Sequence, residues 1–71
     1  METYKDRNTE RVILDSSECS CEHETDKAYL LEIENEENCI KMWLPKSQVF
    51  YVDSGCFDIP VWLLEKNEVY L

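Results

Sequence analysis

Apolar and polar residues alternate along two neighbouring segments of the chain, KAYLLEIE (27–34) and CIKMWL (39–44). In an extended chain, side chains two positions apart share a face, so each segment presents one row of large apolar residues. The polar stretch NEEN (35–38) between them has the length and composition of a hairpin turn. The sequence therefore predicts an antiparallel β-hairpin over 27–44.

Shorter apolar runs flank this hairpin. The runs at 10–15 (ERVILD) and 49–53 (VFYVD) predict two further strands, and 69–71 is a candidate for a last one. The segment 16–26 is rich in Ser, Glu and Cys and has no apolar period, so it predicts a loop or a hairpin tip. The polar segment 1–9 is expected to be a flexible N-terminus.

The two prolines and the single glycine mark the ends of predicted elements in the second half of the chain. Pro45 lacks a backbone donor and should end the second hairpin strand. The following residues, 45–48, are typical of a tight turn or one turn of 3₁₀ helix. Ser54-Gly55 marks another turn. Proline is favoured at the first position of a helix, so Pro60 predicts a short helix over 60–67.

Together these elements predict a mainly β domain of four or five short strands with one short C-terminal helix near 60–67. A chain of 71 residues has room for a single domain, which we place at 10–71. The expected architecture is a small, partly open antiparallel β-barrel of SH3-like or OB-like type. A flat meander covered by the helix is the alternative.

Acidic residues crowd the middle of the chain. Of the formal net charge of −9, a net −7 falls between residues 18 and 37, where eight acids meet one lysine. Such a field repels nucleic acid and anionic lipid and attracts basic protein surfaces. The alternative is a solvated surface that keeps a small domain soluble. If the acids bind a partner, we expect them to cluster at one end of the domain. The candidates on the predicted loop and turn are Glu22, Glu24, Asp26, Glu34, Glu36 and Glu37.

Two tryptophans, Trp43 and Trp62, are expected in the core. The alternation nevertheless places Trp43 opposite the aliphatic row of its own strand. If exposed, Trp43 would lie beside Lys41 and Lys46 and would be a typical interface anchor. It would also be able to stack on a single-stranded base.

Four cysteines and one histidine are the candidate metal ligands. Cys19, Cys21 and His23 would share a face of a strand, and Cys39 or Cys56 would complete a zinc tetrahedron. The one-residue spacing of the first two cysteines is wrong for a common zinc knuckle, so the sequence favours reduced, metal-free thiols. His23 has no partner for general acid–base chemistry. No catalytic residues are predicted, and we expect no enzyme activity.

The stretches ETDKAYLLEI (24–33) and WLPKSQV (43–49) resemble small phage and prophage proteins of unassigned function. Their pattern is E-T-x-K-A-x-L-x-E-I, followed by Trp, Leu or Ile, and Pro-Lys-Ser-Gln with Val or Ile. The segment IPVWL (59–63) is similar to their aliphatic-Pro-x-Trp-Leu ending, so the resemblance covers about 13–65. The Ser/Cys-rich segment before residue 24 and the VFYVD run depart from the pattern. The resemblance implies a virus-encoded protein acting in a bacterial or archaeal cytoplasm.

Three functions follow as hypotheses. The first is an acidic protein-interaction module that inserts its carboxylates into a Lys/Arg-lined groove, as an inhibitor or nucleic-acid mimic acting on a defence or replication protein. Trp43 would be its desolvated anchor. The second is an accessory module that binds single strands through Trp43, Tyr51, Lys41 and Lys46. The third is a small zinc-stabilised structural domain. The sequence leaves the partner's identity and the oligomeric state open.

Overall fold

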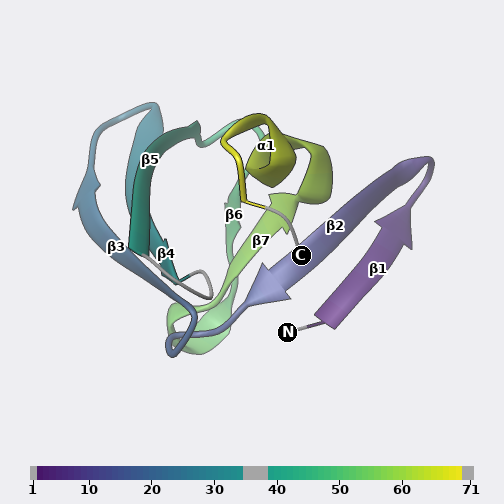
Figure 1. Cartoon of the computed structure of the whole chain (residues 1–71), viewed down its shortest axis with the longest axis horizontal. Helices are drawn as coiled ribbons and strands as arrows, with labels where there is room; N and C mark the ends of the chain where they lie inside the picture. The colour runs from purple at the N-terminus through teal and green to yellow at the C-terminus, as the bar shows by residue number, and fades with distance from the viewer. Residues whose placement is uncertain (1, 35–38, 70–71) are drawn as a thin grey trace.

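Two antiparallel sheets and one short helix make up the part of the chain that the structure describes (Figure 1). The computed structural model describes residues 2–34 and 39–69. The elements in chain order are β1 (Glu2–Asp6), β2 (Thr9–Leu14), β3 (Cys19–Glu24), β4 (Ala28–Glu34), β5 (Cys39–Pro45), β6 (Phe50–Tyr51), the 3₁₀ turn η1 (Asp53–Gly55), β7 (Phe57–Pro60) and α1 (Val61–Lys66). The four-stranded sheet has the order β1-β2-β7-β6, and the three-stranded sheet has the order β3-β4-β5.

The predicted hairpin is confirmed as the pair β4 and β5. The two strands are antiparallel, with Ala28 opposite Pro45 and Glu34 opposite Cys39. Leu31 and Met42 face each other across the pair, and both are buried. The alternation of the sequence therefore fixes which face of this hairpin turns inward. Its predicted turn, 35–38, lies outside the described residues.

The core lies between the two sheets, and α1 covers one end of it (Figure 1). Residues of β2, β3, β4, β5, β7 and α1 contribute to it. The fully buried side chains of the core include Val12, Leu14, Leu31, Ile33, Leu44, Ile59 and Leu64. Burying one Leu or Ile contributes about 1.5–3 kcal/mol to folding. The prediction of a mainly β domain with a short C-terminal helix is confirmed.

The two sheets do not close into a barrel. The chain passes between them through residues 15–18 and 46–49, and they share no strand among the described residues. In Figure 1 the hairpin of β1 and β2 extends away from the three-stranded sheet. The SH3-like or OB-like type therefore stays a prediction.

The prediction of a loop over 16–26 is wrong, because this segment contains β3. The strand pairs with β4, with Cys19 opposite Ile33 and Glu24 opposite Tyr29. Only Cys19 of the strand is buried. An outer strand that exposes nearly all its side chains needs no apolar period, so its sequence carries no strand signal.

Residues 1–9, expected to be a flexible N-terminus, contain β1. This strand pairs with β2 along its whole length. Its described side chains are exposed, so hydrogen bonds to β2, rather than an apolar row, hold it in the sheet. The polar composition of the segment therefore gave no indication of the strand.

The second half of the chain differs from its prediction in the position of one strand. The run at 49–53 provides only the two residues of β6, and the longer strand is β7, which is buried throughout. A four-residue run containing Asp and Pro gives little strand signal. The helix predicted over 60–67 is observed as α1, with Pro60 as its N-cap. Of the candidate strand at 69–71, Val69 is in no strand and the other two residues lie outside the described part.

Candidate functional site

Trp43 is exposed on the side of the three-stranded sheet that faces away from the core. It lies opposite Leu30 of β4, and Leu30 lies opposite His23 of β3. The imidazole of His23 meets the indole edge to face, with 6.0 Å between the ring centroids. We call these three residues the outer patch. The Trp43 side chain is 51% exposed, so its predicted burial is wrong, because Met42 and Leu44 take the inward positions of β5.

A β-bulge in β3 determines where His23 points. The register shifts between Cys21 and His23, so that Cys21 lies opposite Leu31 and His23 opposite Leu30. Because one extra residue reverses the alternation of a strand, His23 moves to the outer patch. The expectation that Cys19, Cys21 and His23 share one face is therefore wrong for His23.

The candidate zinc ligands are dispersed. Cys19 is buried, and burial raises the pKa of its thiol to about 12. Cys21 is exposed, and its thiol donates a hydrogen bond of 3.3 Å to the carbonyl oxygen of His23. Cys39 is exposed at the start of β5. Within 2–34 and 39–69, no three His, Cys, Asp or Glu side chains are grouped closely enough to hold a metal ion.

The acidic side chains are divided between the two ends of the three-stranded sheet. Glu24 and Asp26 lie near the start of β4, whereas Glu34 ends it. At about 3.4 Å per residue, the length of β4 separates these ends by roughly 20 Å. Because β3 is a strand rather than a loop, it carries Glu24 away from the hairpin tip. The prediction of a single acidic cluster is wrong for these residues, and Glu36 and Glu37 lie outside the described part.

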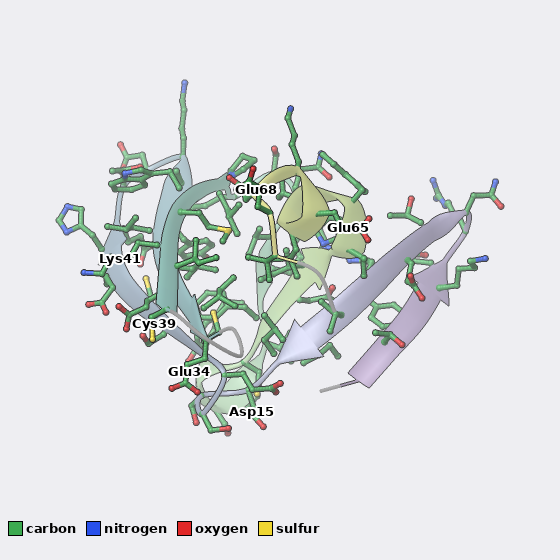
Figure 2. All side chains as sticks on the ribbon, in the orientation of Figure 1. Asp15, Glu34, Cys39, Lys41, Glu65 and Glu68 are labelled. Atoms are coloured by element: carbon green, nitrogen blue, oxygen red, sulfur yellow. The ribbon has the colours of Figure 1, made fainter. Side chains whose placement is uncertain are left out.

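The Glu34 end of the sheet meets the turn that follows β2. The Glu34 amide donates to the Glu18 carbonyl oxygen over 2.9 Å. Asp15 and Glu34 lie toward the same end of the molecule, as Figure 2 shows. The hydroxyl and amide of Ser17 donate to the Asp15 carboxylate and lower its pKa. This end therefore carries negative charge at neutral pH.

The other end carries an internal ion pair. The Lys46 ammonium contacts the Glu24 carboxylate and lies 4.9 Å from the centroid of the Tyr29 ring. Glu24 in turn raises the pKa of Lys46. Lys46 is therefore paired with Glu24 in this structure. Asp26 is exposed near the same end of the sheet, and Glu22 is exposed at the bulge of β3.

An aromatic cavity opens beside Glu24. It has a volume of about 320 Å³, and its lining residues are Cys21, Glu24, Tyr29, Tyr51 and Phe57. The Phe57 ring packs edge to face against both tyrosines, with centroid distances of 5.3 Å to Tyr29 and 5.4 Å to Tyr51. Sequence reasoning missed this cavity. Tyr51 and Phe57 come from the paired strands β6 and β7, whereas Tyr29 comes from β4 of the other sheet. Alternation gave only the inward direction of Tyr29.

The four-stranded sheet contains a buried ion pair that the sequence did not reveal. Arg11 and Asp58 are 6% and 8% exposed, and the Arg11 Nε lies 2.7 Å from an Asp58 carboxylate oxygen. The Tyr4 hydroxyl donates to the same carboxylate, which raises the pKa of Tyr4. Arg11 also donates to the Gln48 carbonyl oxygen over 2.7 Å and lies over the Phe50 ring. We call these five residues the Arg11 network.

The four residues proposed for single-strand binding do not lie together. Lys41 and Trp43 share the outward side of β5. Tyr51 lines the aromatic cavity and Lys46 pairs with Glu24, so both lie beside a carboxylate. Figure 2 shows Lys41 on the outer side of the three-stranded sheet.

Trp62 is the second tryptophan whose predicted burial is wrong. It is 47% exposed on α1, because Leu63 and Leu64 take the side of the helix that faces the core. With Glu10 and Glu65 it borders a cavity of about 220 Å³ near the β1–β2 turn. Trp62 therefore offers an exposed indole on the other side of the domain from β3.

Comparisons of this chain with protein-family models, with curated proteins and with solved structures give no match. In the part of the chain that the structure describes, no helix has the length and apolar character needed to cross a membrane.

Proposed function

We propose that this protein is a small interaction module of phage type that binds a basic surface on a larger nucleic-acid-handling protein. The observation that carries the proposal is the exposed Trp43 at the centre of the outer patch. A half-exposed indole packed against His23 and Leu30 offers apolar area at a fixed orientation. Tryptophan is enriched among the residues that dominate binding energy at protein interfaces.

Electrostatics supports a basic partner. The chain has a net charge of −9. Exposed carboxylates lie at both ends of the three-stranded sheet, at Asp26 on one side and at Glu34 on the other, and Glu22 is exposed at the bulge of β3. A partner that covers Trp43 would therefore meet acids on two sides of the indole. Such complementarity mainly accelerates association and makes binding sensitive to salt.

The biological setting is part of the same proposal. The resemblance to phage and prophage proteins supports a virus-encoded inhibitor or nucleic-acid mimic. It would act in the host cytoplasm on a defence or replication protein. Binding alone would produce this effect, so the proposal assigns no catalytic residue and no cofactor. We also propose that the two sheets form a fold of SH3-like or OB-like type. The binding mechanism does not depend on this fold type.

The two other hypotheses have less support. Single-strand binding needs Tyr51 and Lys46 away from the acids, yet both lie beside Glu24. A zinc-stabilised domain needs ligands that converge, and His23 is turned to the outer patch while Cys19 is in the core.

Capture of a partner from host lysate tests the proposal. The tagged protein should retain a basic protein at about 0.05 M salt and lose most of it at about 0.5 M, where screening is strong. Trp43→Ala should lower the retained amount at least about tenfold, as expected for a hot-spot residue. Trp62→Ala is the matched control, because Trp62 is similarly exposed, at 47%, but lies on α1. Equal capture by wild type and Trp43→Ala, or equal capture at both salt concentrations, would contradict the proposal.

A further inference from the structure

The aromatic cavity combines three rings with one carboxylate. Tyr29, Tyr51 and Phe57 provide the rings, and Glu24 provides the charge. Its volume of about 320 Å³ lies at the small end of the range of roughly 300–1,000 Å³ that is typical of ligand pockets. The space therefore suits a single side chain better than a large metabolite.

These lining groups favour a cation. The faces of aromatic rings carry negative electrostatic potential, and ammonium and guanidinium groups bind to them. A carboxylate beside the rings adds a charged hydrogen-bond acceptor. An anionic occupant would meet Glu24 and the net charge of −9, and an apolar occupant would leave the carboxylate desolvated without a partner.

The chain itself contains an example of this chemistry. The Lys46 ammonium contacts the Glu24 carboxylate and lies 4.9 Å from the centroid of the Tyr29 ring. Glu24 and Tyr29 also line the cavity. A lysine on a partner would thus find two groups that already bind an ammonium, together with two further rings.

We propose that the aromatic cavity receives a lysine or arginine side chain from the basic surface of a partner protein. Lys46 is then an internal competitor, which an incoming cation displaces from Glu24 and Tyr29. The inference rests on the proposed function in that the same partner supplies this side chain. β3 connects the two regions, because His23 belongs to the outer patch and Glu24 lines the cavity.

Titration with a hexalysine peptide at low salt tests the cavity. Tyr51→Leu should weaken binding about three- to fivefold, the loss expected for one cation–π contact at an exposed site. Tyr51→Phe keeps the ring and should retain the wild-type affinity. Ring-proton NMR shifts on titration should be largest for Tyr29, Tyr51 and Phe57.

Charge-matched variants separate the cavity from general attraction between the peptide and an acidic protein. Glu24→Gln and Glu34→Gln remove the same charge at opposite ends of the sheet. Glu24→Gln should weaken peptide binding about fivefold more than Glu34→Gln does. Lys46→Met and Lys41→Met also match in charge, so both should gain the same general attraction. Lys46→Met should tighten binding more than Lys41→Met does, because it also removes the competing ammonium.

Equal affinities for Tyr51→Leu and Tyr51→Phe, or equal effects within each charge-matched pair, would overturn the cavity proposal. So would an absence of peptide binding by the wild-type protein at low salt. These results would leave the proposed function intact if Trp43 still governs capture from lysate. Conversely, cavity-dependent peptide binding without any captured basic protein would contradict the proposed function and support the cavity.

Discussion

The two sheets use charged and aromatic residues in opposite ways. In the four-stranded sheet, Arg11 and Asp58 are almost completely buried, and the Arg11 network pairs their polar atoms with one another. In the three-stranded sheet, Trp43 and His23 contact each other but stay exposed. The polar groups of the first arrangement are paired within the fold, whereas the exposed rings of the second can contact another molecule.

Because of this difference, we expect substitutions in the Arg11 network to change stability and substitutions in the outer patch to change binding. The Arg11 network joins four parts of the chain, because Tyr4 lies on β1, Arg11 on β2, Phe50 on β6 and Asp58 on β7. Removing one member leaves a buried partner without its counterpart. The outer patch lies on one side of the three-stranded sheet, and the other side of that sheet packs on the core, so changes in the patch should leave the fold intact. The following predictions test this contrast in order of expected effect.

The largest effect is expected for Asp58→Ala. This change leaves the buried Arg11 guanidinium without its carboxylate, and breaking one side of a buried ion pair typically costs about 3–5 kcal/mol. Urea denaturation should show this loss in the free energy of unfolding. Replacing both members, as in Arg11→Met with Asp58→Leu, should recover most of it, because no charge then stays buried. A loss below about 1 kcal/mol for Asp58→Ala would remove the basis of the comparison.

A smaller loss is expected on raising the pH. The Cys19 thiol has its pKa raised from 9.0 to about 12 by burial, so the unfolded chain releases this proton at a lower pH than the folded chain does. Its contribution to stability is therefore full below about pH 9 and is lost between about pH 9 and 12. The raised pKa values of Tyr4 and Lys46 act in the same direction. Urea midpoints measured at increasing pH should fall, and Cys19→Val should reduce the slope; a midpoint that rises above pH 9 would contradict the sign.

The next effect compares two equally exposed aromatic residues, one in each sheet. Phe50 is 52% exposed and lies under the Arg11 guanidinium, whereas Trp43 is 51% exposed on the outer patch. Phe50→Ala should lower the free energy of unfolding by about 1–2 kcal/mol, because it removes a cation–π contact to a desolvated guanidinium. Trp43→Ala should change it by less than about 1 kcal/mol while lowering partner capture at least about tenfold. The reverse order in thermal or urea denaturation would show that the two faces had been assigned wrongly.

The smallest effect is expected for the ion pair between Glu24 and Lys46. Both side chains are solvent-accessible, and exposed ion pairs contribute little to stability. Glu24→Gln should leave the urea midpoint unchanged within error at physiological salt. A clear destabilisation would mean that Glu24 supports the fold, and its effect on peptide binding would then need correction for unfolding.

The sequence predicted those parts of the fold in which apolar residues alternate. The hairpin of β4 and β5 is such a case, since the inward positions of Leu31 and Met42 follow from period two alone. β1 and β3 were missed because each lies at the border of its sheet and exposes most of its side chains. Their hydrogen bonds to a neighbouring strand leave no apolar pattern in the sequence.

The candidate sites were predictable only in part. The alternation around Trp43 indicated that one side of β5 would be exposed, although burial was the expected outcome. The bulge that turns His23 toward Trp43 has no clear sequence signal. The Arg11 network joins residues 47 positions apart, and the aromatic cavity likewise depends on long-range packing. Such pairings are set by the topology of the fold, which local patterns in a single sequence do not reveal.

The bulge in β3 has a consequence for self-assembly. β3 borders the three-stranded sheet, and an uninterrupted border strand is a template to which another molecule can add its own strand. The irregular register at Cys21 and His23, with the adjacent glutamates, disfavours such growth along this side. β5 at the opposite border is regular over seven residues. If copies of the protein aggregate into fibrils at high concentration, extension of the three-stranded sheet should therefore begin at β5 rather than at β3.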